Sequence, residues 1–207
     1  CVIMDVLTKI LSAAAELFRQ YGFKTITMDD IARRAGISKK TLYQHFANKN
    51  EVIHESLSWY MEHMVSNCTA IVSNAENAVA EMIRLIELFD QNHKHTNPLV
   101  FLELQRYYPE AYELFRVRIL EKNVEILREN IIRGMEDGLY RTGLNPDLMA
   151  RFHIEASLLA FQPTLLVNDH HDLRYVNREL CEHFMYGIMT HKGEKLYQKY
   201  KAQYLKQ

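Results

Sequence analysis

Residues 27–46 read TMDDIARRAGISKKTLYQHF, and this stretch decides the fold of the N-terminal part of the chain. Thr27 stands three residues before Asp30, a spacing typical of a capped helix start. The short apolar run that follows stops at Gly36, a residue that adopts a left-handed turn at low cost. Ser38 then caps a further short helix. Two short helices joined by a tight glycine turn predict a helix-turn-helix.

The residues on either side of this stretch complete a helical domain. Apolar residues recur at steps of three and four from Leu7 to Tyr21, which predicts a first helix that Gly22 ends. Asn48 with Glu51 three residues later predicts the start of a fourth helix. The sequence therefore places the helix-turn-helix inside a small helical bundle.

The second helix of such a pair can enter the major groove of DNA and present its outer side chains to base edges. Lysines on that face supply phosphate or guanine contacts, and hydroxyls and histidine donate to phosphate oxygens. The predicted outer face consists of Lys39, Lys40, Thr41, Tyr43, Gln44 and His45. Two alternatives stay open: the motif is an ordinary tight helical pair, or Tyr43 belongs to the core.

Charge is distributed unevenly along the chain. Residues 1–50 carry eight Lys or Arg against four Asp or Glu, a formal charge of +4, whereas the whole chain has a formal charge of -1. A basic head on an acidic body is typical of local nucleic-acid contact, although a solvated basic face gives the same count.

Length and composition favour an all-helical soluble protein. The 207 residues are 48% hydrophobic and 25% charged, and 7 Gly and 4 Pro leave few breaks for many short strands. No uncharged stretch reaches the roughly 20 residues of a membrane-spanning helix. Cys1, Cys68 and Cys181 are odd in number and lack paired spacing, so we expect reduced thiols and a cytoplasmic protein.

Longer helices are predicted beyond residue 51. We expect an all-α protein of about nine helices, with a helix-turn-helix domain at 1–50 and a helical ligand-binding and dimerisation domain at 51–207. A tail from Gly193 forms either another helix or a mobile end. The predicted later helices run from Val79 to Phe89, from Pro98, from Pro109 to Asp137, from Pro146 through Leu166 with a kink at Pro163, and from Val176 to Ile188.

The segment 27–46, followed by residues 48–51, resembles the DNA-binding segment of the TetR/AcrR family of bacterial transcriptional regulators. The resemblance covers roughly residues 7–57 and implies a homodimer, joined through the eighth and ninth helices, that binds an inverted-repeat DNA operator and responds to a small effector. No Arg stands on the recognition helix, which leaves the direct base readers undefined. The positions that match DNA-contacting positions of the family are Thr27, Ser38, Lys39, Lys40, Thr41, Tyr43, His45 and Lys49.

An apolar effector pocket is predicted among the longer helices, where aromatic and methionine side chains gather. The alternative is that these side chains fill a dry core. Glu155 is included because a carboxylate within an apolar helix needs a partner. The pocket candidates are Met82, Phe89, Phe101, Leu104, Tyr108, Tyr112, Phe115, Phe152, Glu155 and Phe161.

The resulting hypothesis is that the chain is a ligand-responsive transcriptional regulator, with repression as the preferred output. No enzymatic activity, cofactor or metal is expected. The sequence lacks a nucleophile elbow, a glycine-rich phosphate loop and an HExxH motif. The pairs His170 with His171 and His93 with His95 are interpreted as solvated loops rather than metal ligands. Alternatives are an activator of the same architecture, a helical small-molecule-binding protein without DNA function, and an enzyme that uses the aromatic cavity.

Overall fold

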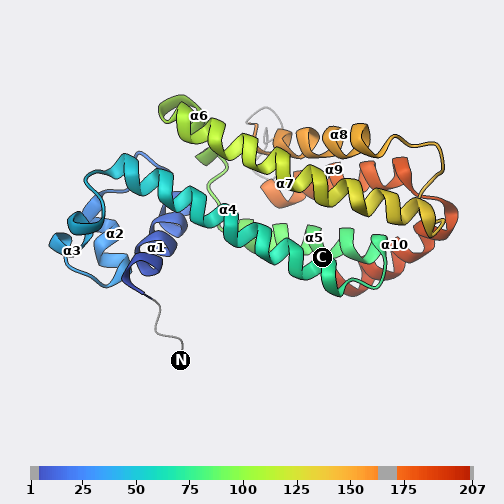
Figure 1. The fold of residues 1–207 in the computed structure, drawn as a ribbon, viewed down its shortest axis with the longest axis horizontal. Helices are drawn as coiled ribbons and strands as arrows, with labels where there is room; N and C mark the ends of the chain where they lie inside the picture. The colour runs from blue at the N-terminus through green and yellow to red at the C-terminus, as the bar shows by residue number, and fades with distance from the viewer. Residues whose placement is uncertain (1–4, 163–171, 206–207) are drawn as a thin grey trace. The chain divides into compact units, whose positions relative to one another are not determined.

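The computed structural model describes residues 5–162 and 172–205, and the described chain is helical, with a lone β-bridge between Tyr140 and Met189. No helix in this part of the chain is long and apolar enough to cross a lipid bilayer. The elements are α1 Val6–Tyr21, α2 Met28–Ala35, α3 Lys39–His45, α4 Lys49–Asn74, α5 Ala78–His93, α6 Val100–Tyr107, α7 Pro109–Glu136, α8 Pro146–Leu158, the 3-10 helix η1 Leu159–Phe161, α9 Leu173–Ile188 and α10 His191–Tyr204 (Figure 1).

The chain divides into two compact units. The first comprises Cys1–Met64 and His95–Arg118, and the second comprises Val65–Lys94 and Ile119–Gln207. The helices α4 and α7 each continue from one unit into the other. Helix α6 thus groups with the N-terminal helices. The functional boundary at residue 50 stays a prediction.

The first unit is built around one apolar core. Helix α1 packs on α2 and α6, and α2 packs on α3. Leu42 of α3 is fully buried, and Leu104 of α6 is only 1% exposed. A residue far along the chain therefore fills the core of the helix-turn-helix unit. The core side chains include Ile10, Leu11, Phe18, Phe23, Ile31, Leu42, Phe46, Val52, Ile53, Val100 and Leu104.

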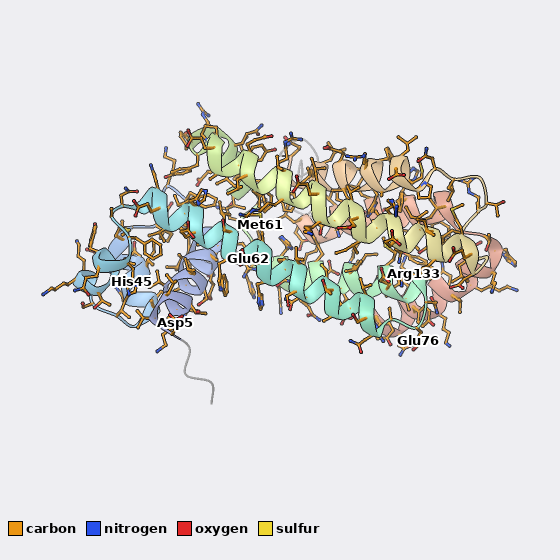
Figure 2. The ribbon with its side chains drawn as sticks, in the orientation of Figure 1. Asp5, His45, Met61, Glu62, Glu76 and Arg133 are labelled. Carbon is orange, nitrogen blue, oxygen red and sulfur yellow. The ribbon has the colours of Figure 1, made fainter. Side chains whose placement is uncertain are left out.

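The second unit places α5 against α9 and α10, and α8 against α9. A buried polar chain joins its parts: the Tyr140 hydroxyl donates to Asn130 Oδ1 at 3.0 Å, and Asn130 Nδ2 donates to the carbonyl of Ala78 at 2.9 Å. Arg133, labelled on α7 in Figure 2, donates to the buried carboxylate of Glu81 at 2.6 Å. These bonds fix the end of α7 to the start of α5.

Several expected helix bounds are confirmed, including the start of α7 at Pro109. The tail is a helix, α10. Pro98, however, lies in a turn before α6, because the Asn97 side chain accepts from the Leu99 N–H at 2.9 Å and its carbonyl accepts from Val100 at 3.1 Å. The structure therefore starts α6 at Val100.

Helix α8 ends at Leu158 and tightens into η1, which is earlier than the sequence predicted. Gln162 is extended, with φ -86° and ψ 130°, as a residue before a proline prefers. Pro163 and Leu166, where the kink and the helix end were expected, lie outside the described residues.

We predict that Gly134→Ala destabilises the second unit by roughly 1–3 kcal/mol, because an added methyl overpacks a filled site. A Cβ at Gly134 would stand 2.1 Å from the ring of Tyr140, which is itself fully buried. Urea unfolding of both proteins measures the difference. The control Glu121→Ala, at an exposed position on the same helix, should change the free energy of unfolding by less than about 0.5 kcal/mol. Equal effects of the two changes would refute the close packing.

Stability of the second unit should also depend on pH through His153. Its ring packs on Phe184 with centroids 4.2 Å apart, and burial lowers the pKa of His153 to about 4. The unfolded chain takes up this proton near pH 6.5, so stability falls as pH drops from 6.5 toward 4, by about 2 kcal/mol at pH 5.

Urea unfolding at pH 7 and pH 5 checks this expectation. His153→Gln should lose this part of the pH dependence, whereas His191→Gln, at an exposed position, should retain it. Indistinguishable pH profiles for the wild type and His153→Gln would contradict the expectation.

Candidate nucleic-acid interface

The turn between α2 and α3 is fixed by Gly36. Its φ of 69° and ψ of 33° lie in the left-handed region. The Gly36 N–H donates to the carbonyl of Arg33 at 3.2 Å, and the Ile37 N–H donates to the carbonyl of Ala32 at 3.0 Å. This pattern closes the end of α2. A Cβ at Gly36 would meet nothing within 4 Å, so its positive φ alone explains the glycine.

Thr27 and Asp30 form the predicted cap at the start of α2. The Asp30 N–H donates to Thr27 Oγ1 at 3.2 Å, and the Thr27 N–H donates to Asp30 Oδ2 at 3.0 Å. The Thr27 hydroxyl also donates to Asp30 Oδ2 at 2.6 Å, and this bond lowers the pKa of Asp30. A phosphate contact of the Thr27 hydroxyl would therefore replace a bond to Asp30.

Helix α3 has one buried and one exposed side. Ser38 caps it by accepting from the Thr41 N–H at 3.0 Å. Leu42 is fully buried, while Tyr43 is 46% exposed, so the alternative in which Tyr43 belongs to the core is wrong. Lys40 and His45 are exposed as well, and Figure 2 labels His45 on this helix. The face opposite Leu42 is polar, basic and open to solvent.

Two of the candidate lysines already have partners within the first unit. The Lys39 ammonium lies 2.8 Å from Asp29 Oδ1, and this bond raises the pKa of Lys39. The Lys49 ammonium donates to the carbonyl of Lys24 at 3.4 Å. Partial burial lowers the pKa of Lys49, and the charges of Glu103 and Asp30 oppose that effect. The Lys39 ammonium is thus held at the start of α2, and Lys49 itself is the first residue of α4.

All eight candidate DNA contacts belong to the first unit. They lie at the start of α2, on α3 with its cap, and at the start of α4. Six of them are exposed, and Thr41 and Lys49 are partly buried. Their contacts with DNA stay a prediction.

The effector-pocket candidates divide between the two units. Phe101, Leu104, Tyr108, Tyr112 and Phe115 belong to the first, and Met82, Phe89, Phe152, Glu155 and Phe161 belong to the second. Each unit brings some of its own set together. The rings of Phe101 and Phe115 lie 5.1 Å apart in the first unit, and those of Phe89 and Phe161 lie 6.0 Å apart in the second.

Two pocket candidates on α8 face solvent. Phe152 is 54% exposed, and Glu155 is exposed as well. Apolar composition along α8 did not reveal that Glu155 lies on an exposed side of the helix. The role of these residues at an effector site stays a prediction.

The sequence interpretation missed a buried ion pair in the second unit. Asp90 of α5 is 8% exposed and pairs with Arg178 of α9, while its Oδ1 has no hydrogen-bond partner. Desolvation raises the pKa of Asp90. Asp90 follows Ile86, which is buried, by four residues, so helical phase could have placed it inward.

His93 is buried at the end of α5 and stacks on Phe89 at 4.0 Å, so it does not belong to a solvated loop as the sequence suggested. Within the described ranges no three His, Cys, Asp or Glu residues are close enough to hold a metal ion. His170 and His171 lie outside those ranges. Cys68 and Cys181 are free thiols, and burial raises the pKa of Cys181 to about 12.

Comparison with known proteins agrees with this geometry. Residues 10–55 match the family model described as bacterial regulatory proteins, tetR family. The N-terminal segment of the chain is therefore similar to the DNA-binding segment of the TetR family. The HTH-type transcriptional repressor KstR2 of Mycobacterium tuberculosis is 26% identical over 147 residues, which cover 70% of this chain and 74% of that protein.

The relatives are named as transcriptional regulators, and they differ in the output that their names state. The HTH-type transcriptional activator FasR of Mycolicibacterium smegmatis is 43% identical over 58 residues, covering 28% of this chain and 26% of FasR. The structure of the regulator FadR from Bacillus subtilis in complex with stearoyl-CoA has a TM-score of 0.66 at 20% identity and covers 88% of this chain and 99% of that one. The FadR similarity shows a shared fold.

We predict that Tyr43→Ala weakens binding to every duplex by roughly tenfold, because a hydroxyl that contacts phosphate carries no sequence information. Fluorescence anisotropy with specific and scrambled duplexes measures the loss. Tyr21→Ala, at a similarly exposed tyrosine on α1, is the matched control and should bind normally. Unchanged affinity of the Tyr43 variant would argue against a phosphate contact.

Replacement of Lys39 by Met separates two kinds of contact. If its ammonium leaves Asp29 for a phosphate, the slope of log affinity against log salt should decrease by about 1 for all duplexes. If Lys39 contacts guanine, discrimination between specific and scrambled duplexes should fall instead. A salt series with both duplexes distinguishes the two, and no change in either quantity would remove Lys39 from the interface.

Proposed function

We propose that this chain is a ligand-responsive transcriptional repressor that binds an inverted-repeat operator as a homodimer. The observation that carries the proposal is that α3 has one buried and one exposed side. Leu42 is fully buried in the core, and Lys40, Tyr43 and His45 therefore face outward. A short helix with hydroxyl, imidazole and ammonium groups on one side suits a major groove. Its operator would lie in the bacterial cytoplasm, and no catalytic role is assigned.

Exposed apolar side chains on α8 and α9 support the dimer. Leu148 and Phe152 are 59% and 54% exposed, and their spacing of four residues puts them on one face of α8. Tyr175 and Tyr186 of α9 are 46% and 44% exposed. Large exposed apolar side chains gathered on two packed helices are typical of an interface. We place the two-fold contact on these helices.

Two-fold symmetry accounts for the proposed operator. A symmetric dimer presents two copies of α3, which reach successive major grooves when they stand about 34 Å apart. The operator should then be an inverted repeat with half-sites one helical turn apart.

The effector would act by changing this spacing. Helices α4 and α7 each belong to both units, so a change in the second unit has two continuous helices through which to act on the first. An effector regulates only if it prefers one spacing, since equal affinity for both leaves the populations unchanged. FadR was solved with stearoyl-CoA, and we propose an apolar effector for this chain, held among Met82, Phe89 and Phe161.

Activation is the second candidate output, because FasR, the relative that is 43% identical over 58 residues, is named an activator. A reporter gene placed behind an operator that the wild-type protein selects from a random-sequence pool separates the two outcomes. Deletion of the regulator should raise expression if the chain represses. A fall in expression would identify an activator.

The dimer proposal predicts that Phe152→Asp gives a monomer that loses specific DNA affinity, because a charge enters an apolar contact. Sedimentation and anisotropy measure the two quantities on the same sample. Val117→Asp, at an exposed apolar position of the first unit, is the control and should stay dimeric. A Phe152→Asp protein that remains a dimer with full affinity would contradict the assigned interface.

A further inference from the structure

Glu103 of α6 accepts two hydrogen bonds from the turn that follows α1. Glu103 Oε2 accepts hydrogen bonds from the N–H of Phe23 at 2.8 Å and from the N–H of Lys24 at 3.3 Å. Both groups lie in the first unit, although 80 residues separate Glu103 from Phe23. Two successive backbone donors on one anionic oxygen form a charge-assisted contact of the stronger kind.

Gly22 makes room for this contact. Its φ is 86°, in the region that glycine tolerates best. A Cβ at this position would stand 2.7 Å from Glu103 Oε2, closer than real Cβ atoms approach. The residue that ends α1 therefore also permits the carboxylate to reach the two N–H groups.

Further contacts hold the same turn. The N–H of Asn97, just before α6, donates to the carbonyl of Arg19 at 2.8 Å. The ring of Phe23 lies 5.8 Å from that of Tyr108. The Lys24 ammonium lies 4.5 Å from the centre of the Tyr107 ring, a cation–π distance. The end of α1 and the turn after it are thus bound to α6 and its flanks at Arg19, Phe23 and Lys24.

The same turn supports a candidate DNA contact on its other side. The carbonyl of Lys24 accepts from the Lys49 ammonium at 3.4 Å, so one residue joins Glu103 to Lys49 through its own backbone. The turn also leads within three residues to Thr27, the cap of α2. The position of the turn therefore sets the position of the Lys49 ammonium relative to the start of α2.

We propose that Glu103 is a positioning residue for DNA binding, which fixes the Gly22–Lys24 turn and thereby aims the Lys49 ammonium at a phosphate. Glu103 itself stays away from the duplex and acts through the Lys24 backbone. This inference rests on the proposed function in that the duplex is the operator. It assigns a DNA-binding role to a residue far outside the helix-turn-helix segment.

A double-mutant cycle in the intact 207-residue chain tests the proposal, with a duplex selected from a random-sequence pool by the wild type as the probe. Glu103→Gln and Lys49→Met should each weaken binding by roughly tenfold. In the Glu103→Gln background, Lys49→Met should cost less than about twofold, and each single change should lower the salt slope by about 1. Damage to the fold alone would not produce this coupling.

Two further variants complete the test. Glu103→Asp keeps the charge but shortens the side chain, so it should bind DNA as weakly as Glu103→Gln; wild-type affinity would show that only the charge matters. Glu110→Gln, an exposed glutamate in the same unit, is the matched control and should leave binding unchanged.

Circular dichroism melts test whether each variant is folded, and Glu103→Asp replaces Glu103→Gln in the cycle if the latter is not. Additive losses, or wild-type binding by Glu103→Gln, would overturn the proposal while leaving the regulator assignment intact. A wild-type protein that selects no duplex would instead refute the proposed function.

Discussion

The left-handed turn at Gly36 is the constraint on which the proposed DNA-binding surface depends. With φ at 69°, the chain reverses sharply enough for the Ile37 N–H to reach the carbonyl of Ala32 at 3.0 Å. Helix α3 then leaves the turn in a direction that buries Leu42 completely. Burial of that one side chain sets the rotation of α3 about its own axis, and the opposite face, which we propose contacts DNA, is left exposed to solvent.

A second constraint operates over a longer distance. Glu103 holds the turn after α1, and Leu104 beside it fills the apolar core of the same unit. The unit that contains the helix-turn-helix is therefore completed by residues 95–118, which lie well beyond the segment 10–55 that the family model matches. Helix α6 thus belongs to the unit that contains the helix-turn-helix. It is directly followed by α7, one of the two helices shared with the second unit.

The features that the sequence predicted well are local. The Thr27–Asp30 cap and the left-handed Gly36 are set by neighbours within three or four residues, and both are confirmed. Asn48 accepts from the Glu51 N–H at 3.1 Å, as its spacing indicated. The Glu103 contact was not predictable in this way, because no local sequence pattern around Phe23 indicates a hydrogen-bond partner 80 residues away. The exposed position of Glu155 was also not predictable, because an apolar helix can still expose one face.

The most direct test of the central claim is selection of bound duplexes from a random-sequence pool by the purified wild-type protein, followed by sequencing. Two copies of α3 in a symmetric dimer predict enrichment of an inverted repeat whose half-site centres lie about one helical turn apart. Failure to enrich any duplex, or enrichment of a single half-site without symmetry, would contradict the account.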